Sequence, residues 1–98
     1  MDFEFKVDAE IKQEFLENKP TATARSNGFI LKLADEYEEI AGKPIYNMTY
    51  AELKELIAVQ FKNSSLATIT KNISILRKYI DFCIEKHLVS HMENRLAM

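Results

Sequence analysis

The sequence predicts an all-α domain of four main helices, and three observations support this. The chain of 98 residues holds only two Gly and two Pro, and 47% of its residues are hydrophobic, which is a globular rather than a disordered composition. Apolar residues recur every three or four positions along most of the chain, the period of a helix face. The length is that of a single domain with one core.

The first two helices are expected on either side of Pro20. Asp8 is a candidate N-cap for the first helix, which ends at Asn18 and Lys19 because a residue before proline is disfavoured in the α region. The second helix starts near Thr21 or Thr23, either of which can cap it, and stops at Gly42. Its apolar stripe comprises Ile30, Leu33, Ala34, Tyr37 and Ile40. The acids of this helix are expected on an exposed surface: Asp35, Glu36, Glu38 and Glu39.

The third and fourth helices have recognisable starts. Thr49 and Glu52 form a capping box, and the third helix then runs to Phe61. Ser65 can cap a fourth helix that ends near Lys86. The apolar stripe of this last helix is the strongest periodic signal in the chain: Leu66, Ile69, Ile73, Leu76, Ile80, Cys83 and Ile84.

Residues 1–8 alternate apolar and polar side chains, which is a strand pattern, but no second strand is available to pair with them. We expect an extended N-terminal arm at 1–8, followed by a helical domain at 9–98. No apolar run reaches the length of about 18–20 residues that a membrane span requires, so no membrane partner is expected. The single Cys83 excludes an intrachain disulfide and fits a reducing cytoplasmic setting.

The acids and bases are unevenly distributed. The chain carries 15 acidic and 13 basic residues, yet every acid lies outside two windows, 18–34 and 56–80. The windows contain seven basic residues: Lys19, Arg25, Lys32, Lys62, Lys71, Arg77 and Lys78. They are also rich in short polar side chains that suit a phosphate surface. Because the net charge of −2 gives no global attraction to a polyanion, any nucleic-acid contact must be local. A solvated helix face would explain the same pattern.

No catalytic constellation or cofactor motif is recognisable. No nucleophile stands at a known spacing from a base, and the two glycines are isolated, so no phosphate-binding loop is present. Cys83, His87 and His91 share one helical face and form a possible metal set. Because Cys83 belongs to the core stripe, we favour a buried thiol with two surface imidazoles, and we expect no metal.

The order of motifs resembles the N-terminal core-binding domain of the tyrosine recombinase, or phage integrase, family. The connector Gly42-Lys43-Pro44-Ile45 matches that family. The third helix matches at Thr49, Glu52 and Leu53. The fourth helix matches at six positions: Ser65, Thr68, Ile69, Leu76, Arg77 and Tyr79. The similarity covers roughly residues 9–96. The family often has Asn-Pro before its catalytic domain, where this chain has Glu93-Asn94-Arg95-Leu96.

The resemblance implies a compact, SAM-like bundle of four helices that covers one side of a DNA duplex. In such domains the second and fourth helices approach DNA, and the catalytic residues belong to a separate C-terminal domain. The domain alone should therefore be non-catalytic and need no cofactor. The DNA-binding candidates follow from both the charge pattern and the resemblance: Arg25, Ser26, Lys32, Ser64, Ser65, Thr68, Lys71, Asn72, Arg77 and Lys78.

The expected partners are double-stranded DNA and, on DNA, further recombinase protomers. In isolation the domain is expected to be a monomer, and the protein a cytoplasmic one encoded by a bacterium or a phage. The alternative is a helical protein–protein interaction module without a DNA role. That module would use Phe29, Ile75 or Phe82 as an exposed apolar patch.

Overall fold

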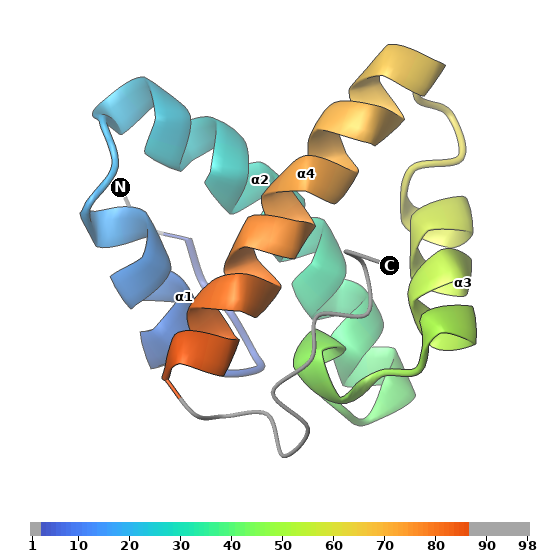
Figure 1. Cartoon of the computed structure of the whole chain (residues 1–98), viewed down its shortest axis with the longest axis horizontal. Helices are drawn as coiled ribbons and strands as arrows, with labels where there is room; N and C mark the ends of the chain where they lie inside the picture. The colour runs from blue at the N-terminus through green and yellow to red at the C-terminus, as the bar shows by residue number, and fades with distance from the viewer. Residues whose placement is uncertain (1–2, 87–98) are drawn as a thin grey trace.

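A computed structural model describes residues 3–86, which form four α-helices and one short 3-10 helix (Figure 1). The elements in chain order are α1 (Ala9–Glu17), α2 (Thr21–Ala41), η1 (Ile45–Asn47), α3 (Tyr50–Gln60) and α4 (Leu66–Glu85). The two long helices, α2 and α4, cross each other in Figure 1, with α1 and α3 on either side. Helix α2 contacts all three other α-helices. The predicted all-α bundle is confirmed.

The helix boundaries follow the predicted caps in most places. Thr49 Oγ1 accepts from the amide of Glu52 at 3.2 Å, and the Glu52 carboxylate accepts from the amide of Thr49 at 2.8 Å, which is the predicted capping box. Ser65 Oγ accepts from the amide of Thr68 at 3.2 Å. Gly42 ends α2 with φ 75°, a conformation that L side chains rarely adopt. Asp8 stands at the N-cap of α1 but makes no capping hydrogen bond.

The core takes residues from every helix and from the N-terminal arm. Leu31, Leu56, Leu76 and Tyr79 are fully buried at its centre. Two residues of the predicted stripes are instead exposed, because each lies in a terminal turn that no neighbouring helix covers. Ile40, near the end of α2, is 84% exposed, and Leu66, the first residue of α4, is 80% exposed.

A buried ionic cluster joins α1 to α2, and it contradicts the prediction that the acids of 35–39 all face solvent. The side chains of Lys12, Asp35 and Glu38 are fully buried. Lys12 Nζ lies 2.8 Å from Asp35 Oδ1 and 2.5 Å from Glu38 Oε1. Asp35 and Glu38 follow Leu31 by four and seven positions, so they share its core-facing side of the helix. Charge alone suggested solvent exposure, but spacing places both carboxylates in the core.

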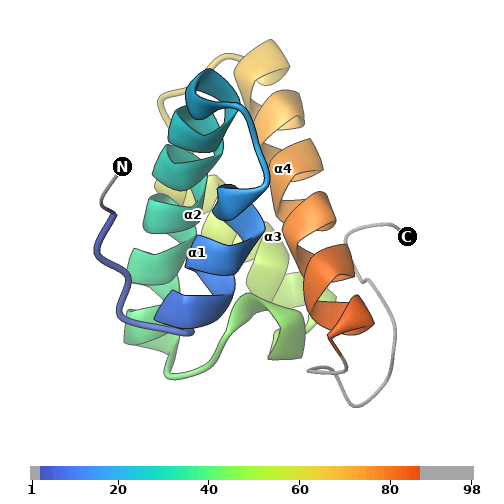
Figure 2. The ribbon, with the colours of Figure 1, turned by 90° about the vertical axis from the view of Figure 1, so that its left-hand side faces the viewer.

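The arm is packed on the helices, although its division from the domain at residue 8 stays a prediction. Figure 2 shows it running beside α1 and α2, on the side away from α4. Phe5 belongs to the core. Phe3 lies against Gly28, where an added Cβ would stand 2.2 Å from its ring, so the glycine in mid-helix makes room for the arm. The amides of Lys6 and Val7 donate to the Asp35 carboxylate at 2.8 and 2.9 Å.

Candidate nucleic-acid interface

A groove lies between the N-terminal half of α2 and the facing turns of α4. In Figure 1 these two halves diverge from the point where the helices cross. The groove has a volume of about 490 Å³, and it is lined by nine residues: Lys19, Ala22, Thr23, Ser26, Asn27, Lys71, Ser74, Ile75 and Lys78. Residues far apart in the sequence thus form one concave surface. Both acid-free windows contribute to it.

The lining of this groove is basic and rich in hydrogen-bond donors. It holds three lysines, Lys19, Lys71 and Lys78, and no acidic residue. Thr23, Ser26 and Ser74 add hydroxyl groups. The ammonium of Lys19 lies 4.3 Å from the centre of the Phe15 ring, a cation–π distance that holds this side chain beside the groove. This surface can attract and hydrogen-bond an anion, whereas the chain as a whole carries net negative charge.

Three of the predicted DNA-binding residues line the groove: Ser26, Lys71 and Lys78. Ser64, Ser65 and Thr68 lie further toward the start of α4, outside the lining. Ser65 and Thr68 are exposed, and their hydroxyls hydrogen-bond each other at 3.0 Å. The beginning of α4 therefore continues the polar surface beyond the groove.

The remaining predicted residues lie elsewhere. Lys32 donates to the backbone carbonyl of Glu4, so it serves the arm on the other side of α2. Arg25 is exposed but lies roughly 130° around α2 from the centre of the groove lining, at about 100° per residue. Arg77 is exposed on α4 outside the lining, and Asn72 is only 5% exposed. Arg25 and Lys32 therefore do not line the groove with the bases of α4, and Lys19 contributes the base on the α2 side.

The prediction omitted four lining residues that matter to the chemistry: Lys19, Thr23, Asn27 and Ser74. All four belong to the acid-free windows, so the signal was present. Among the residues that line the groove, Asn27 is distinctive because it is 6% exposed yet makes no hydrogen bond through its side chain to any residue within 3–86. The helical spacing of Thr23, Ser26 and Asn27 would have grouped them on one face.

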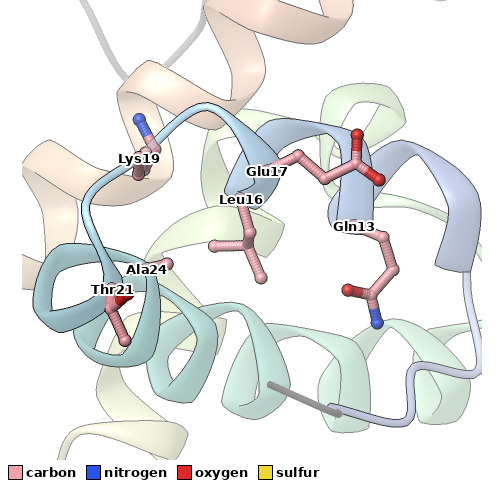
Figure 3. A pocket seen from close by; sticks show the side chains of 6 residues that line it. All are labelled: Gln13, Leu16, Glu17, Lys19, Thr21 and Ala24. Atoms are coloured by element: carbon pink, nitrogen blue, oxygen red, sulfur yellow. The ribbon is translucent and has the colours of Figure 1, made fainter.

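A second hollow, of about 250 Å³, lies between the end of α1 and the start of α2. Its lining comprises Gln13, Leu16, Glu17, Lys19, Thr21 and Ala24. In Figure 3, Gln13 and Leu16 point toward α2, while Lys19 points away from it. An acid, Glu17, belongs to this lining, and Gln13 Nε2 already donates to the carbonyl of Phe3 at 2.7 Å. This hollow therefore lacks the uniform positive charge of the groove.

The other chemistries considered from the sequence find little support in the described part of the chain. Among residues 3–86, no group of three or more His, Cys, Asp or Glu side chains is placed to hold a metal ion. His87 and His91 lie outside the described residues. Cys83 is buried, and burial raises the pKa of its thiol to about 12, so the reactive thiolate is disfavoured. None of the helices within this range is long and apolar enough to cross a membrane.

Of the three residues offered for the protein-interaction alternative, only Phe29 is strongly exposed. Ile75 is 7% exposed and lies at the floor of the groove. Phe82 is partly buried against the core, where its ring meets Phe15 at a centroid distance of 5.4 Å. Phe29 remains 60% exposed and touches Phe3 edge-on. The three residues therefore do not form one exposed surface.

The fold and the groove define a small all-α domain that presents a basic, concave surface between two crossing helices. Comparison with family models identifies it further. The chain belongs to the family described as MrpR, N-terminal core-binding domain, whose model matches residues 6–85. No match is found among curated proteins or among solved structures. The predicted core-binding domain is confirmed, and the match extends from the arm to the end of α4.

Proposed function

We propose that this core-binding domain binds double-stranded DNA through the groove between α2 and α4. The observation that carries the proposal is the meeting of two acid-free segments in one concave surface with three lysines and no acid. Membership of a core-binding family supports it. The ligand is a polyanion, because every charged group in the lining is a cation.

The mechanism is neutralisation of phosphates by lysine, with short hydroxyls completing the contacts. Lys19, Lys71 and Lys78 would each release condensed counterions from DNA. Three phosphate contacts give a slope of log affinity against log salt of roughly −3. Thr23, Ser26 and Ser74 donate short hydrogen bonds that set the position of the domain along the backbone. An affinity in the range of ~10⁻⁴ to 10⁻⁶ M, that of non-specific binding at physiological salt, is expected for the domain alone.

We further propose that the domain belongs to a protein of the tyrosine recombinase kind and acts as the non-catalytic half of a clamp around the duplex. The match to a core-binding family and the resemblance at the capping box and the start of α4 support this. In this scheme a partner domain covers the opposite side of the DNA, further protomers assemble on the same site, and the isolated domain is monomeric. The setting is the cytoplasm of a bacterium.

The test is a titration of fluorescein-labelled duplex DNA, followed by anisotropy, at several salt concentrations. The double variant Lys71→Glu with Lys78→Glu should weaken binding at least a hundredfold and flatten the salt slope by about two. Lys54→Glu is the matched control, because Lys54 is exposed on α3 and outside the groove. Absence of wild-type binding at low salt, or an equal loss in the control, would refute the proposal.

A further inference from the structure

Among the residues that line the groove, Asn27 is a nearly buried polar residue whose side chain has no hydrogen-bond partner within the described chain. Only 6% of the surface of this residue is exposed, and Asn27 lines the groove. A buried carboxamide ordinarily satisfies its two donors and its acceptor inside the protein. Here the Asn27 side chain makes no hydrogen bond to any residue among 3–86. Within that range its amide atoms are not among the polar atoms that lack both a hydrogen-bond partner and access to solvent. Because Asn27 lines the groove, its amide can be reached from there.

The shape of the groove decides which part of a duplex can reach this amide. Asn27 and Ile75 are the nearly buried residues of the lining, at 6% and 7% exposed, and so form its floor, whereas Lys71 and Lys78 are exposed on α4. Only a group that protrudes from the ligand can enter such a concavity. In a duplex the sugar–phosphate backbones protrude, and the base edges are recessed in the grooves. An apolar side chain next to an amide suits a deoxyribose next to its phosphate.

The donors around Asn27 point to the same ligand group. Three lysines and the hydroxyl-bearing Thr23, Ser26 and Ser74 line the groove together with Asn27. Phosphate oxygens accept hydrogen bonds and carry negative charge, so they satisfy every one of these donors. A base edge presents donors as well as acceptors, and the lysines could not satisfy those donors.

We propose that the groove receives the sugar–phosphate backbone of one DNA strand and that the Asn27 amide hydrogen-bonds one phosphate at its floor. This inference rests on the proposed DNA binding and deepens it, because it assigns the contact to the backbone and not to base edges. Lysine side chains are flexible and hold phosphates loosely, whereas a buried amide has a fixed position. Asn27 thereby sets the register of the domain along the strand without reading its sequence.

The experiment compares Asn27→Ala with the wild type on two duplexes of unrelated sequence, one rich in A·T and one rich in G·C. Loss of a hydrogen bond to a charged group should weaken binding roughly tenfold or more on both duplexes equally. The salt slope should not change, because a neutral amide displaces no counterion, while Lys71→Ala should lower it by about one. Asn47→Ala is the control and should bind like the wild type, because Asn47 is an exposed residue of the 3-10 helix outside the groove lining.

A second variant and a spectrum guard against indirect effects. Asn27→Asp keeps the size of the side chain but presents only acceptors to a phosphate, so its loss should exceed that of Asn27→Ala. In a ¹⁵N–¹H spectrum of the wild type, the side-chain amide of Asn27 is identified by its absence from the alanine variant. It should shift on addition of the A·T-rich duplex more than the side-chain amide of Asn47.

Each outcome is decisive. A loss that affects only one of the two duplexes would show base reading and overturn the backbone assignment. Unchanged affinity of Asn27→Ala, or an unmoved side-chain amide while the backbone amides of Lys71 and Lys78 shift, would also overturn it. Those results leave wild-type binding intact, so they differ from failure of the proposed function, in which the wild type itself does not bind.

Discussion

Raising the pH from about 4.5 to 7 should destabilise this fold, because of the buried cluster of Lys12, Asp35 and Glu38. Two carboxylates share one ammonium there. The Asp35 carboxylate accepts hydrogen bonds from the backbone amides of Lys6 and Val7 and from the Lys12 ammonium. Burial alone would raise the pKa of Asp35, but these hydrogen bonds hold it below its ordinary value. The Glu38 carboxylate accepts hydrogen bonds from the Lys12 ammonium and from one backbone amide, that of Ile45, at 2.8 Å. Burial dominates at Glu38 and raises its pKa from 4.5 to about 7.

The sign and size of the change in stability follow from the difference between the pKa of Glu38 in the folded state and its ordinary value. Between pH 4.5 and 7 the folded state holds a proton on Glu38 that the unfolded chain has released. Stabilisation from this proton is complete below pH 4.5 and is lost as the pH rises through 7. At about 1.36 kcal/mol per pKa unit, the loss in unfolding free energy is about 3 kcal/mol. That is a large share of the ~5–15 kcal/mol that stabilises an ordinary domain.

The assay is urea unfolding followed by circular dichroism at a series of pH values between 4 and 8. Glu38→Gln is the matched variant, because glutamine has the same shape and does not titrate. The difference in unfolding free energy between wild type and variant should change across the pH 4.5–7 window, with the wild type losing stability relative to the variant. Parallel pH profiles for the two proteins would refute the assignment of the proton to Glu38.

Three further predictions concern the packing of the domain. Lys12→Met should lower the unfolding free energy at pH 7 by about 3–5 kcal/mol, since it leaves the buried Asp35 carboxylate without a cation; a loss under about 1 kcal/mol in urea would contradict this. Gly28→Ala should displace the Phe3 ring, since the new Cβ would lie 2.2 Å from it, and release the arm to faster trypsin cleavage at Lys6. An unchanged cleavage rate would show that the arm does not depend on this contact. Thr49→Ala should cost about 1 kcal/mol through loss of the capping box, and an unshifted urea midpoint would count against it.

The helices and most of their ends could be predicted from local sequence, because their signals are local. The capping box at Thr49, the cap at Ser65 and the stop at Gly42 each depend on a few neighbouring residues, and all three are present. Periodicity identified the core face of α4 in part, because Leu76, Ile80 and Cys83 of the stripe are buried but so are Ile75 and Tyr79, which lie beside it. It failed at Ile40 and Leu66, because an apolar period continues to the end of a helix whether or not a neighbour covers the last turn.

The buried cluster could not be predicted from residue type, since acidic side chains are rarely buried without a partner. Its partner, Lys12, lies 23 residues before Asp35, and only the packing of α1 against α2 brings them together. The apolar stripe expected for this helix did not include Leu31, so the positions of Asp35 and Glu38 four and seven residues after it were not recognised as inward-facing.

The interface was predicted at the level of its segments but not of its residues. The two acid-free windows do meet, and Ser26, Lys71 and Lys78 line the groove. Counting bases could not tell which side of α2 each one occupies. Lys32 faces the arm, while Lys19, from the turn before α2, enters the groove.

The attachment of the arm to Asp35 changes where the folding unit of this domain begins. The arm hydrogen-bonds both members of the ion pair between Lys12 and Asp35. The backbone amides of Lys6 and Val7 donate to Asp35, and the carbonyl of Val7 accepts from Lys12. A shortened chain that starts at α1 would keep the charges of Lys12 and Asp35 and lose the three backbone groups that hydrogen-bond them. Anyone who trims the protein for crystallisation, or grafts it onto another domain, should therefore keep the residues from Phe3 onward.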